Sequence, residues 1–298
     1  MIFLNLRTDL ALERQEIVPE SDSEGIFSRK YSEEGIEITH IKVFSENGAR
    51  AIGKPIGSYI TFEVTPFSRG SDLFSSPELR VISRHIKELI PESEEPVLVA
   101  GLGNSEITAD SLGPKTASMI FSTRHIGTAN AENLGLGKIR SVAAVSTGVL
   151  GKTGIETGEM IDGIVKKIKP CAVVVVDALA ARRLERLGTT LQLSTGGIVP
   201  GSGVGNSRQR IDSQTLGVPV ISLGVPTVID AATFIYDITG LPENEIDEAE
   251  KRMNSRITVT PKDIDIMTER ASRLIAMSIN CALQGSISPE EIFSIVSQ

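Results

Sequence analysis

The sequence predicts an α/β protein with a doubly wound sheet that is covered by helices on both faces. From Pro96 onward, strand-like apolar runs alternate with helical patterns along the chain. The runs are continuous, as in Val173 to Val176, which is typical of parallel strands buried on both faces. Two of them lead into an aspartate, Asp110 or Asp177, and ligands bind at the carboxyl ends of the strands in such sheets.

The N-terminal part precedes this alternating pattern. Up to about Glu34 the chain is polar, with an acidic run at 21–25, and we expect a flexible arm there. Alternating residues over 36–43 and a β-branched and aromatic run at 59–64 predict two paired strands at the edge of the sheet. Apolar residues at three- and four-residue steps then predict a helix over 76–90.

The central and C-terminal parts contain further strands and helices. Strands are expected at 97–100, 141–145, 172–176, 189–193 and 218–223, and helices at 111–122, 156–168 and 178–187. Near the end, Thr260 to Asp263 and Ser288 to Glu291 each match a capping box with proline at the first helical position, which predicts two final helices. We expect one domain that includes N-terminal strands within 36–64 and C-terminal helices within 260–298.

The composition is that of a globular protein with an acidic surface. Charged residues make up 23% and hydrophobic residues 40% of the 298 residues, and the net charge is −8. This charge argues against direct nucleic-acid binding, which depends on lysine and arginine neutralising phosphates. No apolar run reaches the ~20 residues of a membrane span, and the first residues lack the features of a signal peptide. With only two cysteines, Cys171 and Cys281, both interpreted as buried thiols, we expect a cytoplasmic protein without membrane contact.

Asp110 and Asp177 are the first candidates for chemistry. Each has a structural alternative, because aspartate is a common N-cap and a predicted helix follows both residues. Asp177 follows four valines, where an isolated carboxylate costs several kcal/mol unless it is paired or protonated. The nearby Arg182 and Arg183 are candidates to set its charge state. Two carboxylates that meet at the strand ends can share one proton and activate water.

Two glycine-rich segments are candidate binding loops. Residues 196–206 hold five glycines, so this stretch is either a loop that binds an extended peptide or an anion, or a plain flexible loop. In the segment 147–156, Lys152 and Glu156 are candidate polar site groups, with solvent-exposed charges as the alternative. This segment is not a P-loop, because Ser146 occupies the position of the first required glycine. The candidate substrate-binding residues are Gly201, Ser202, Gly203, Asn206 and Glu156.

Metal ligands and nucleophilic triads find little support in the sequence. The three histidines, His40, His85 and His125, form no i, i+4 pair, and none lies near a cysteine in the sequence. No Gly-x-Ser-x-Gly motif precedes a helix, and neither cysteine has an evident histidine partner. We therefore predict no metal site and no cofactor.

Five strings of residues resemble the germination protease family of spore-forming bacteria. They occur in the same order over nearly the whole chain, at 7–13, 101–115, 148–157, 176–182 and 200–206. The second string reads Gly-Leu-Gly-Asn-Ser-Glu-Ile-Thr-Ala-Asp-Ser-Leu-Gly-Pro-Lys, and the fourth reads Val-Asp-Ala-Leu-Ala-Ala-Arg. Strings of this length are highly specific.

The resemblance implies an activity, a site and a fold. The family is regarded as a group of atypical aspartic peptidases, which begin the degradation of small acid-soluble spore proteins during germination. Its two essential aspartates fall on Asp110 and Asp177. One is expected to act as general base on water, while the other, kept protonated, polarises the scissile carbonyl. The fold is similar to that of the hydrogenase maturation proteases, a phosphorylase/hydrolase-like three-layer α/β/α sandwich with a mostly parallel sheet.

The resemblance also implies a form of control. The family is made as a zymogen that cleaves itself, and the string from Thr8 to Ala11 resembles the cleavage site in its substrates. We expect scission between Asp9 and Leu10, which makes residues 1–9 a propeptide and residues 10–298 the peptidase domain. The active form implied is a homotetramer in the cytoplasm of the forespore or spore core.

The chain departs from the family pattern at several points. Thr195 stands where an acidic residue is expected, Val199 stands where a histidine is usual, and the segment after Asp237 is shorter. The hydrogenase maturation relatives hold a metal with two acids and a histidine, but no histidine follows Asp177 here. Two alternatives therefore accompany the aspartic endopeptidase. They are a metal-assisted maturation-type peptidase, and a phosphate- or nucleoside-binding protein that uses residues 196–206 as an anion cradle.

Overall fold

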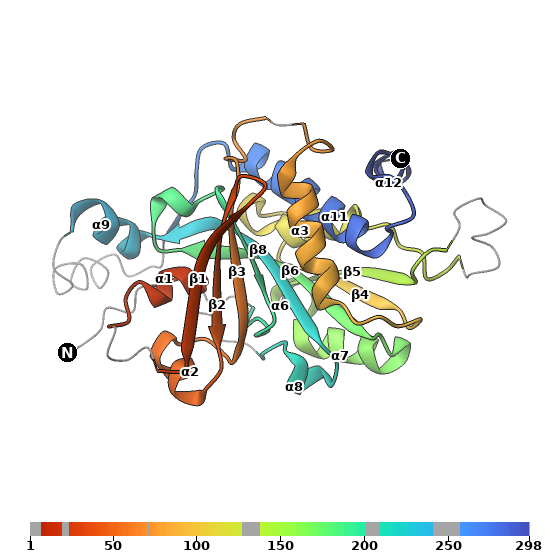
Figure 1. Cartoon of the computed structure of the whole chain (residues 1–298), viewed down its shortest axis with the longest axis horizontal. Coiled ribbons are helices and arrows are strands. Elements are labelled where there is room, and N and C mark those ends of the chain that lie inside the picture. The colour runs from red at the N-terminus through yellow and green to blue at the C-terminus, as the bar shows by residue number, and fades with distance from the viewer. Residues whose placement is uncertain are drawn as a thin grey trace.

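A single mixed β-sheet runs through the molecule, with helices packed on both of its faces (Figure 1). The computed structural model describes residues 7–19, 24–70, 72–126, 138–200, 209–240 and 257–297. Within these ranges the strands are β1 Ile26–Glu33, β2 Ile36–Val43, β3 Gly57–Glu63, β4 Val97–Leu102, β5 Val142–Gly148, β6 Ala172–Ala181, β7 Thr190–Ser194, β8 Val220–Asp230 and β9 Thr258–Val259. Their order in the sheet is β1-β2-β3-β7-β8-β6-β4-β5, and β9 pairs with β8.

The sheet has a parallel part and an antiparallel part. Strands β5, β4, β6 and β8 are parallel, which agrees with their continuous apolar sequences and confirms the α/β class. From β8 outward, β7, β3, β2 and β1 each pair antiparallel with their neighbour. The link between β6 and β7, from Arg182 to Thr189, is too short for the crossover of a dozen or more residues that parallel strands need. The parallel part is therefore limited to four of the described strands.

The helices form a layer on each face of the sheet, as predicted. They are α1 Ala11–Gln15, α2 Glu46–Ile52, α3 Pro77–Leu89, α4 Leu112–Ser118, α6 Leu150–Thr153, α7 Thr157–Ile168, α8 Ser213–Leu216, α9 Ala231–Thr239, α11 Ile264–Leu283 and α12 Pro289–Val296. Helices α3, α4 and α11 pack on one face. On the other face, α7 and α8 pack on the parallel strands, and α1 and α2 pack on β2 and β3 (Figure 1). The sheet surface between these two pairs is left for a cavity.

The predicted helix over 178–187 is wrong. Strand β6 continues through Ala181, because Ala178 to Ala181 pair with the equally extended β8. Only the short 3-10 turn Leu184–Arg186 remains helical. The high helix propensity of alanine and leucine is overridden here by strand pairing and burial.

The flexible arm predicted up to Glu34 is also wrong over most of its length. Residues 8–17 are held against the domain and include α1, with Leu10, Ala11 and Glu13 fully buried. Further on, β1 pairs with β2 at the edge of the sheet. Its polar sequence reflects this position, because most of its side chains are exposed.

Helix boundaries differ from the prediction at two further places. Helix α11 begins at Ile264 with Asp263 as its N-cap, while the Thr260 hydroxyl donates a hydrogen bond to the Thr227 carbonyl instead of capping a helix. Helix α4 ends at Ser118 rather than at residue 122. The second predicted capping box is confirmed, with Ser288 and Glu291 bonding each other's backbone amides at the start of α12.

Two findings bear on the expectations from composition. No helix in the described ranges has the length and apolar character needed to cross a membrane. Cys171 and Cys281 are both free thiols, but they are half-buried instead of fully buried.

Close backbone packing fixes α4 against β4 and β6. A Cβ atom on Gly101 would lie 2.1 Å from the Gly113 carbonyl oxygen. A Cβ atom on Gly113 would lie 2.2 Å from the Leu102 carbonyl oxygen and 2.5 Å from that of Val176. Only glycine allows this approach, which brings the start of α4 onto the ends of two parallel strands.

We therefore predict that Gly113→Ala lowers the free energy of unfolding by about 1–3 kcal/mol, the usual cost of forcing extra atoms into a packed core. The matched control is Gly163→Ala in α7, where a Cβ atom meets nothing within 4 Å. There alanine should raise stability, by up to about 1 kcal/mol, through its better helix propensity. Urea denaturation of both variants checks this, and equal effects would contradict the packing argument.

Candidate active site

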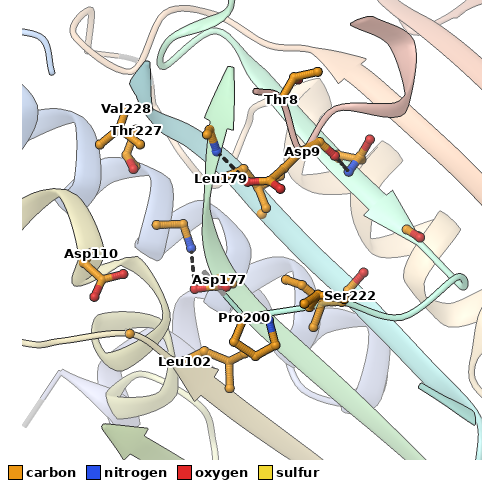
Figure 2. Close-up of a pocket in the computed structure, with 18 of the residues that line it drawn as sticks. Thr8, Asp9, Leu102, Asp110, Asp177, Leu179, Pro200, Ser222, Thr227 and Val228 are labelled. Atoms are coloured by element: carbon orange, nitrogen blue, oxygen red, sulfur yellow. Dashed lines mark hydrogen bonds between the residues drawn. The ribbon is translucent and has the colours of Figure 1, made fainter. Parts of the chain in front are cut away.

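A cavity of about 650 Å³ opens at the carboxyl ends of β4, β6 and β8, on the face that carries α1, α2, α7 and α8. Asp110 and Asp177 both line it, as does Asp9 from the N-terminal arm (Figure 2). The position at the strand ends is the one that the sequence predicts. The arm's presence there, including the Asp9 side of the expected scissile bond, is a finding of the structure.

Asp177 lies within β6 and is 6% exposed. It is not a helix N-cap, because no helix follows it. One of its carboxylate oxygens accepts a hydrogen bond from the Ala178 amide at 2.9 Å. On the neighbouring strand, Asp177 pairs with Gly224, where a Cβ atom would lie 2.6 Å from the Asp177 carbonyl oxygen. The glycine leaves room for the Leu179 side chain, whose Cγ atom would also lie 2.6 Å from that Cβ atom.

Asp110 ends a 3-10 turn, Thr108–Asp110, that connects the end of β4 to α4. Its carboxylate accepts a hydrogen bond from the Asn104 amide at 2.8 Å, so it is not the N-cap of α4, a position held by Ser111. Gly103 has φ +107°, and a Cβ atom there would lie 2.9 Å from the Asp110 carboxylate. Gly103 and Asn104, which follow β4, thus pack around the Asp110 carboxylate.

The packing of α4 brings the two aspartates to the same place. Gly113 lies one helical turn after Asp110 and approaches the carbonyl of Val176, the residue before Asp177. Both carboxylates consequently face the same cavity, one from β6 and one from the β4–α4 connection (Figure 2). The expected meeting of the two side chains depends on this helix placement, which their spacing in the sequence does not fix.

The N-terminal arm is bound to the end of β6 through Asp9. The Asp9 amide donates to the Ala180 carbonyl at 2.9 Å, and the Asp9 carboxylate accepts from the Ala180 amide at 2.9 Å. The carbonyl oxygen of Asp9 accepts from the Lys54 ammonium at 2.8 Å and from the Gln192 amide at 3.1 Å. Leu10 is fully buried in an apolar cluster with Leu179 and others. The expected scissile bond is therefore held on both sides.

Glu13 anchors the arm beyond the expected scissile bond. Its buried carboxylate accepts hydrogen bonds from the backbone amides of Arg182 at 2.6 Å and Arg183 at 2.8 Å, and from the Thr8 hydroxyl. Burial raises the pKa of Glu13 above its usual range, and these hydrogen bonds oppose the rise. On the other side of Asp9, Arg7 forms an ion pair with Asp230 at 3.0 Å.

Sequence reasoning missed Lys54, Gln192 and Glu13. Gln192 carries the clearest signal, because it is a polar residue between two leucines in a predicted strand and it is buried in the structure. Nothing in the sequence around Lys54 marks it. The arginines proposed to act on Asp177 do something else, since their side chains form ion pairs with Glu16, Arg182 at 2.7 Å and Arg183 at 3.1 Å.

The remaining candidates lie in different places. Glu156 is the N-cap of α7 and shares a capping box with Glu159, and it does not line the cavity. The expected substrate-binding residues Gly201, Ser202, Gly203 and Asn206 lie outside the described residues, as do residues 1–6 of the expected propeptide. Val199 lines the cavity, and the Thr195 hydroxyl accepts a hydrogen bond from the Ser58 amide at 3.0 Å.

The described part of the chain contains no group of three or more histidine, cysteine, aspartate or glutamate side chains that could hold a metal ion. His85 lies 3.4 Å from Glu33 of β1, and His40, on β2, has its pKa lowered mainly by burial. Neither histidine lines the cavity.

Comparisons with known proteins identify the family. A sequence model of the germination protease family matches residues 7–241. The germination protease of Caldanaerobacter subterraneus subsp. tengcongensis is 42% identical to this chain, with 98% of each chain covered. That of Clostridium perfringens is 40% identical, covering 97% of this chain and 98% of its own. The germination protease of Priestia megaterium is 32% identical, covering 96% of this chain and 95% of its own.

A solved structure of a NiFe hydrogenase maturation protease from Thermococcus kodakarensis is also similar, with a TM-score of 0.36 and 15% identity over 65% of this chain and 98% of that one. The family match and the nearly full-length relatives define the chain as a peptidase. It belongs to the germination protease family.

The raised pKa of Glu13 predicts a pH dependence. The folded state binds a proton at Glu13 more tightly than the unfolded state, so this residue's contribution to stability falls as pH rises from the ordinary glutamate value through the raised one. Glu13→Gln cannot titrate and should lack this slope. Urea denaturation of both proteins over mildly acidic to neutral pH checks the difference, and parallel stability curves would contradict it.

Proposed function

We propose that this chain is an endopeptidase that hydrolyses peptide bonds with Asp110 and Asp177, and that its first substrate is its own Asp9–Leu10 bond. The observation that carries the proposal is the position of that bond, because Asp9 lines the same cavity as the two aspartates. Membership of the germination protease family supports peptide-bond hydrolysis as the reaction. The cavity is lined by the two carboxylates and by Asp9 of the bound arm.

The proposed reaction uses the aspartates as an acid and base pair. One carboxylate removes a proton from water as the water oxygen attacks the carbonyl carbon of Asp9. The other holds a proton and polarises the Asp9 carbonyl, and the first carboxylate passes the proton taken from water to the Leu10 nitrogen when the bond breaks. Two nearby carboxylates suit this division, because the charge of one favours the protonated form of the other.

The arm makes the full-length chain a zymogen under this proposal. Asp9 forms part of the cavity wall, and Leu10 and Glu13 are buried next to the end of β6, so another peptide cannot bind there until the arm leaves. Cleavage after Asp9 removes the Arg7 and Asp9 anchors and gives a new N-terminus at Leu10. Acidification or drying would promote this step by keeping one aspartate protonated.

The substrates and assembly follow from the family resemblance. The arm string from Thr8 to Ala11 resembles the cleavage site of small acid-soluble spore proteins, so the proposal takes these proteins as the substrates after activation. It also includes a homotetramer in the cytoplasm of the forespore or spore core. The chain contributes to germination by starting the degradation of these proteins.

The proposal is tested by incubating the full-length protein at mildly acidic pH and following its intact mass. Loss of Met1 to Asp9 is expected, with a new N-terminus at Leu10. Purified small acid-soluble spore protein should then be cut by the processed enzyme. A new terminus elsewhere in the arm would contradict the assigned bond, and an intact spore protein would contradict the assigned substrate.

We predict that Asp110→Asn and Asp177→Asn each reduce self-cleavage by at least 1,000-fold, because asparagine keeps the shape of aspartate but cannot accept or supply the proton in the reaction. Circular dichroism should be unchanged. A variant that keeps a tenth or more of the wild-type rate would lose its assigned role.

Chelation separates the proposal from a metal-assisted peptidase. Excess EDTA should leave self-cleavage unchanged, because no metal takes part in the proposed steps. Loss of cleavage that a divalent cation restores would favour the metal-assisted alternative.

A further inference from the structure

We propose that Lys54 and Gln192 are additional catalytic residues, which bind the carbonyl oxygen of the scissile peptide bond and stabilise the negative charge that develops on it. This inference rests on the proposed function. It concerns two residues that neither the aspartate pair nor the five resembling strings include.

The contact geometry is that of a site for a carbonyl oxygen. The Lys54 ammonium at 2.8 Å and the Gln192 amide at 3.1 Å both donate to the oxygen of Asp9. Donors at this distance, placed before the reaction, stabilise an oxyanion as it forms. A carbonyl oxygen has two lone pairs, and these two donors occupy both.

Both side chains are held in place by the fold. Gly53 ends α2 in the left-handed conformation, and the Lys54 amide bonds back to Ala49, which fixes the start of the lysine side chain. The side-chain oxygen of Gln192 accepts the Ala11 amide at 2.7 Å, so its nitrogen is turned toward Asp9. One glutamine thus binds the carbonyl oxygen of Asp9 and the amide of Ala11, on either side of Leu10. These contacts are to the backbone and do not depend on the side chains of the bound peptide.

The register of the sheet places this site beside the catalytic aspartate. Gln192 pairs with Gly224, and Gly224 pairs with Asp177, so the three residues form one row across β7, β8 and β6. Gln192 and Asp177 are therefore about 10 Å apart between Cα atoms, two strand spacings. The Leu179 side chain covers Gly224 between them, where a Cβ atom would lie 2.6 Å from the Leu179 Cγ atom. Asp9, whose carbonyl oxygen Gln192 binds, lines the same cavity as Asp177.

The site changes the role of the second aspartate. Because Lys54 and Gln192 occupy the carbonyl oxygen, the protonated aspartate is not needed there. As water adds to the carbonyl carbon, its proton passes to the basic carboxylate, and the oxygen's charge is met by the two donors. When the bond to Leu10 breaks, the proton of the other aspartate goes to the leaving nitrogen.

The test compares self-cleavage rates of full-length variants by intact mass. Lys54→Met removes the ammonium, and Gln192→Glu keeps an acceptor for the Ala11 amide but removes the donor to Asp9. Each should slow cleavage by about 100- to 1,000-fold, the effect of losing one oxyanion donor. Lys54→Arg should recover part of the rate by restoring a charged donor. The matched control is Lys30→Met on β1, an exposed lysine that does not line the cavity, which should cleave at the wild-type rate.

Docking of the arm is measured separately, by trypsin cleavage after Arg14 before acidification. The arm should stay protected in Lys54→Met and Gln192→Glu, because the contacts of Arg7, Leu10 and Glu13 remain. Cleavage within threefold of wild type in both variants would overturn the inference and leave the proposed function standing. A loss of rate matched by an equal loss of protection would also overturn it, since both residues would then only hold the arm. If the wild type does not cut after Asp9, or Asp177→Asn does, the proposed function fails and the inference fails with it.

Discussion

The hydrogen bonds between Asp9 and Ala180 are the contact on which the arrangement of the site depends. Ala180 lies just past Asp177 on β6, next to a shift in the register with β8. Both of its backbone groups bond to Asp9, one to the amide and one to the carboxylate. Strand β6, which carries the candidate catalytic carboxylate of Asp177, therefore also binds the arm segment around Asp9. Recognition of an extended peptide by the backbone of a strand is a common use of a sheet.

The cost of ordering the arm explains why its contacts are so many. Fixing the backbone of each residue costs about 1–2 kcal/mol, so a polar terminus stays ordered only if it is tied down. Here the burial of Leu10 and the hydrogen bonds of Asp9 and Glu13 stabilise the ordered arm. The Glu13 carboxylate meets two backbone amides at the end of β6, where a buried acid without partners would be unfavourable. An arm bound in this way can serve both as an inhibitor and as a first substrate.

The parallel core is predicted well from the sequence, because the apolar runs that form β4, β6 and β8 are continuous and each is followed by a glycine or an aspartate.

The prediction fails where contacts with other segments of the chain decide the local structure. Alanine and leucine after Asp177 favour a helix locally, but pairing with β8 keeps them in a strand. The polar sequence of the arm predicts disorder, although Asp230 and the residues just after β6 supply partners for its charges. Asp110 and Asp177 are candidates because of their positions after strands, and both line the cavity. Lys54 is not marked by the sequence, since its contact with Asp9 joins residues that are 45 positions apart.

The most direct measurement of the central claim is residue-resolved amide hydrogen exchange of the full-length protein at neutral pH. The amides of Asp9, Ala11 and Ala180 each take part in a hydrogen bond between the arm and the rest of the domain, so they should exchange far more slowly than in an unstructured peptide. Slow exchange at all three positions would support an arm bound at the cavity that Asp110 and Asp177 line. Exchange at the rate of an unstructured peptide at Asp9 and Ala11 would contradict it.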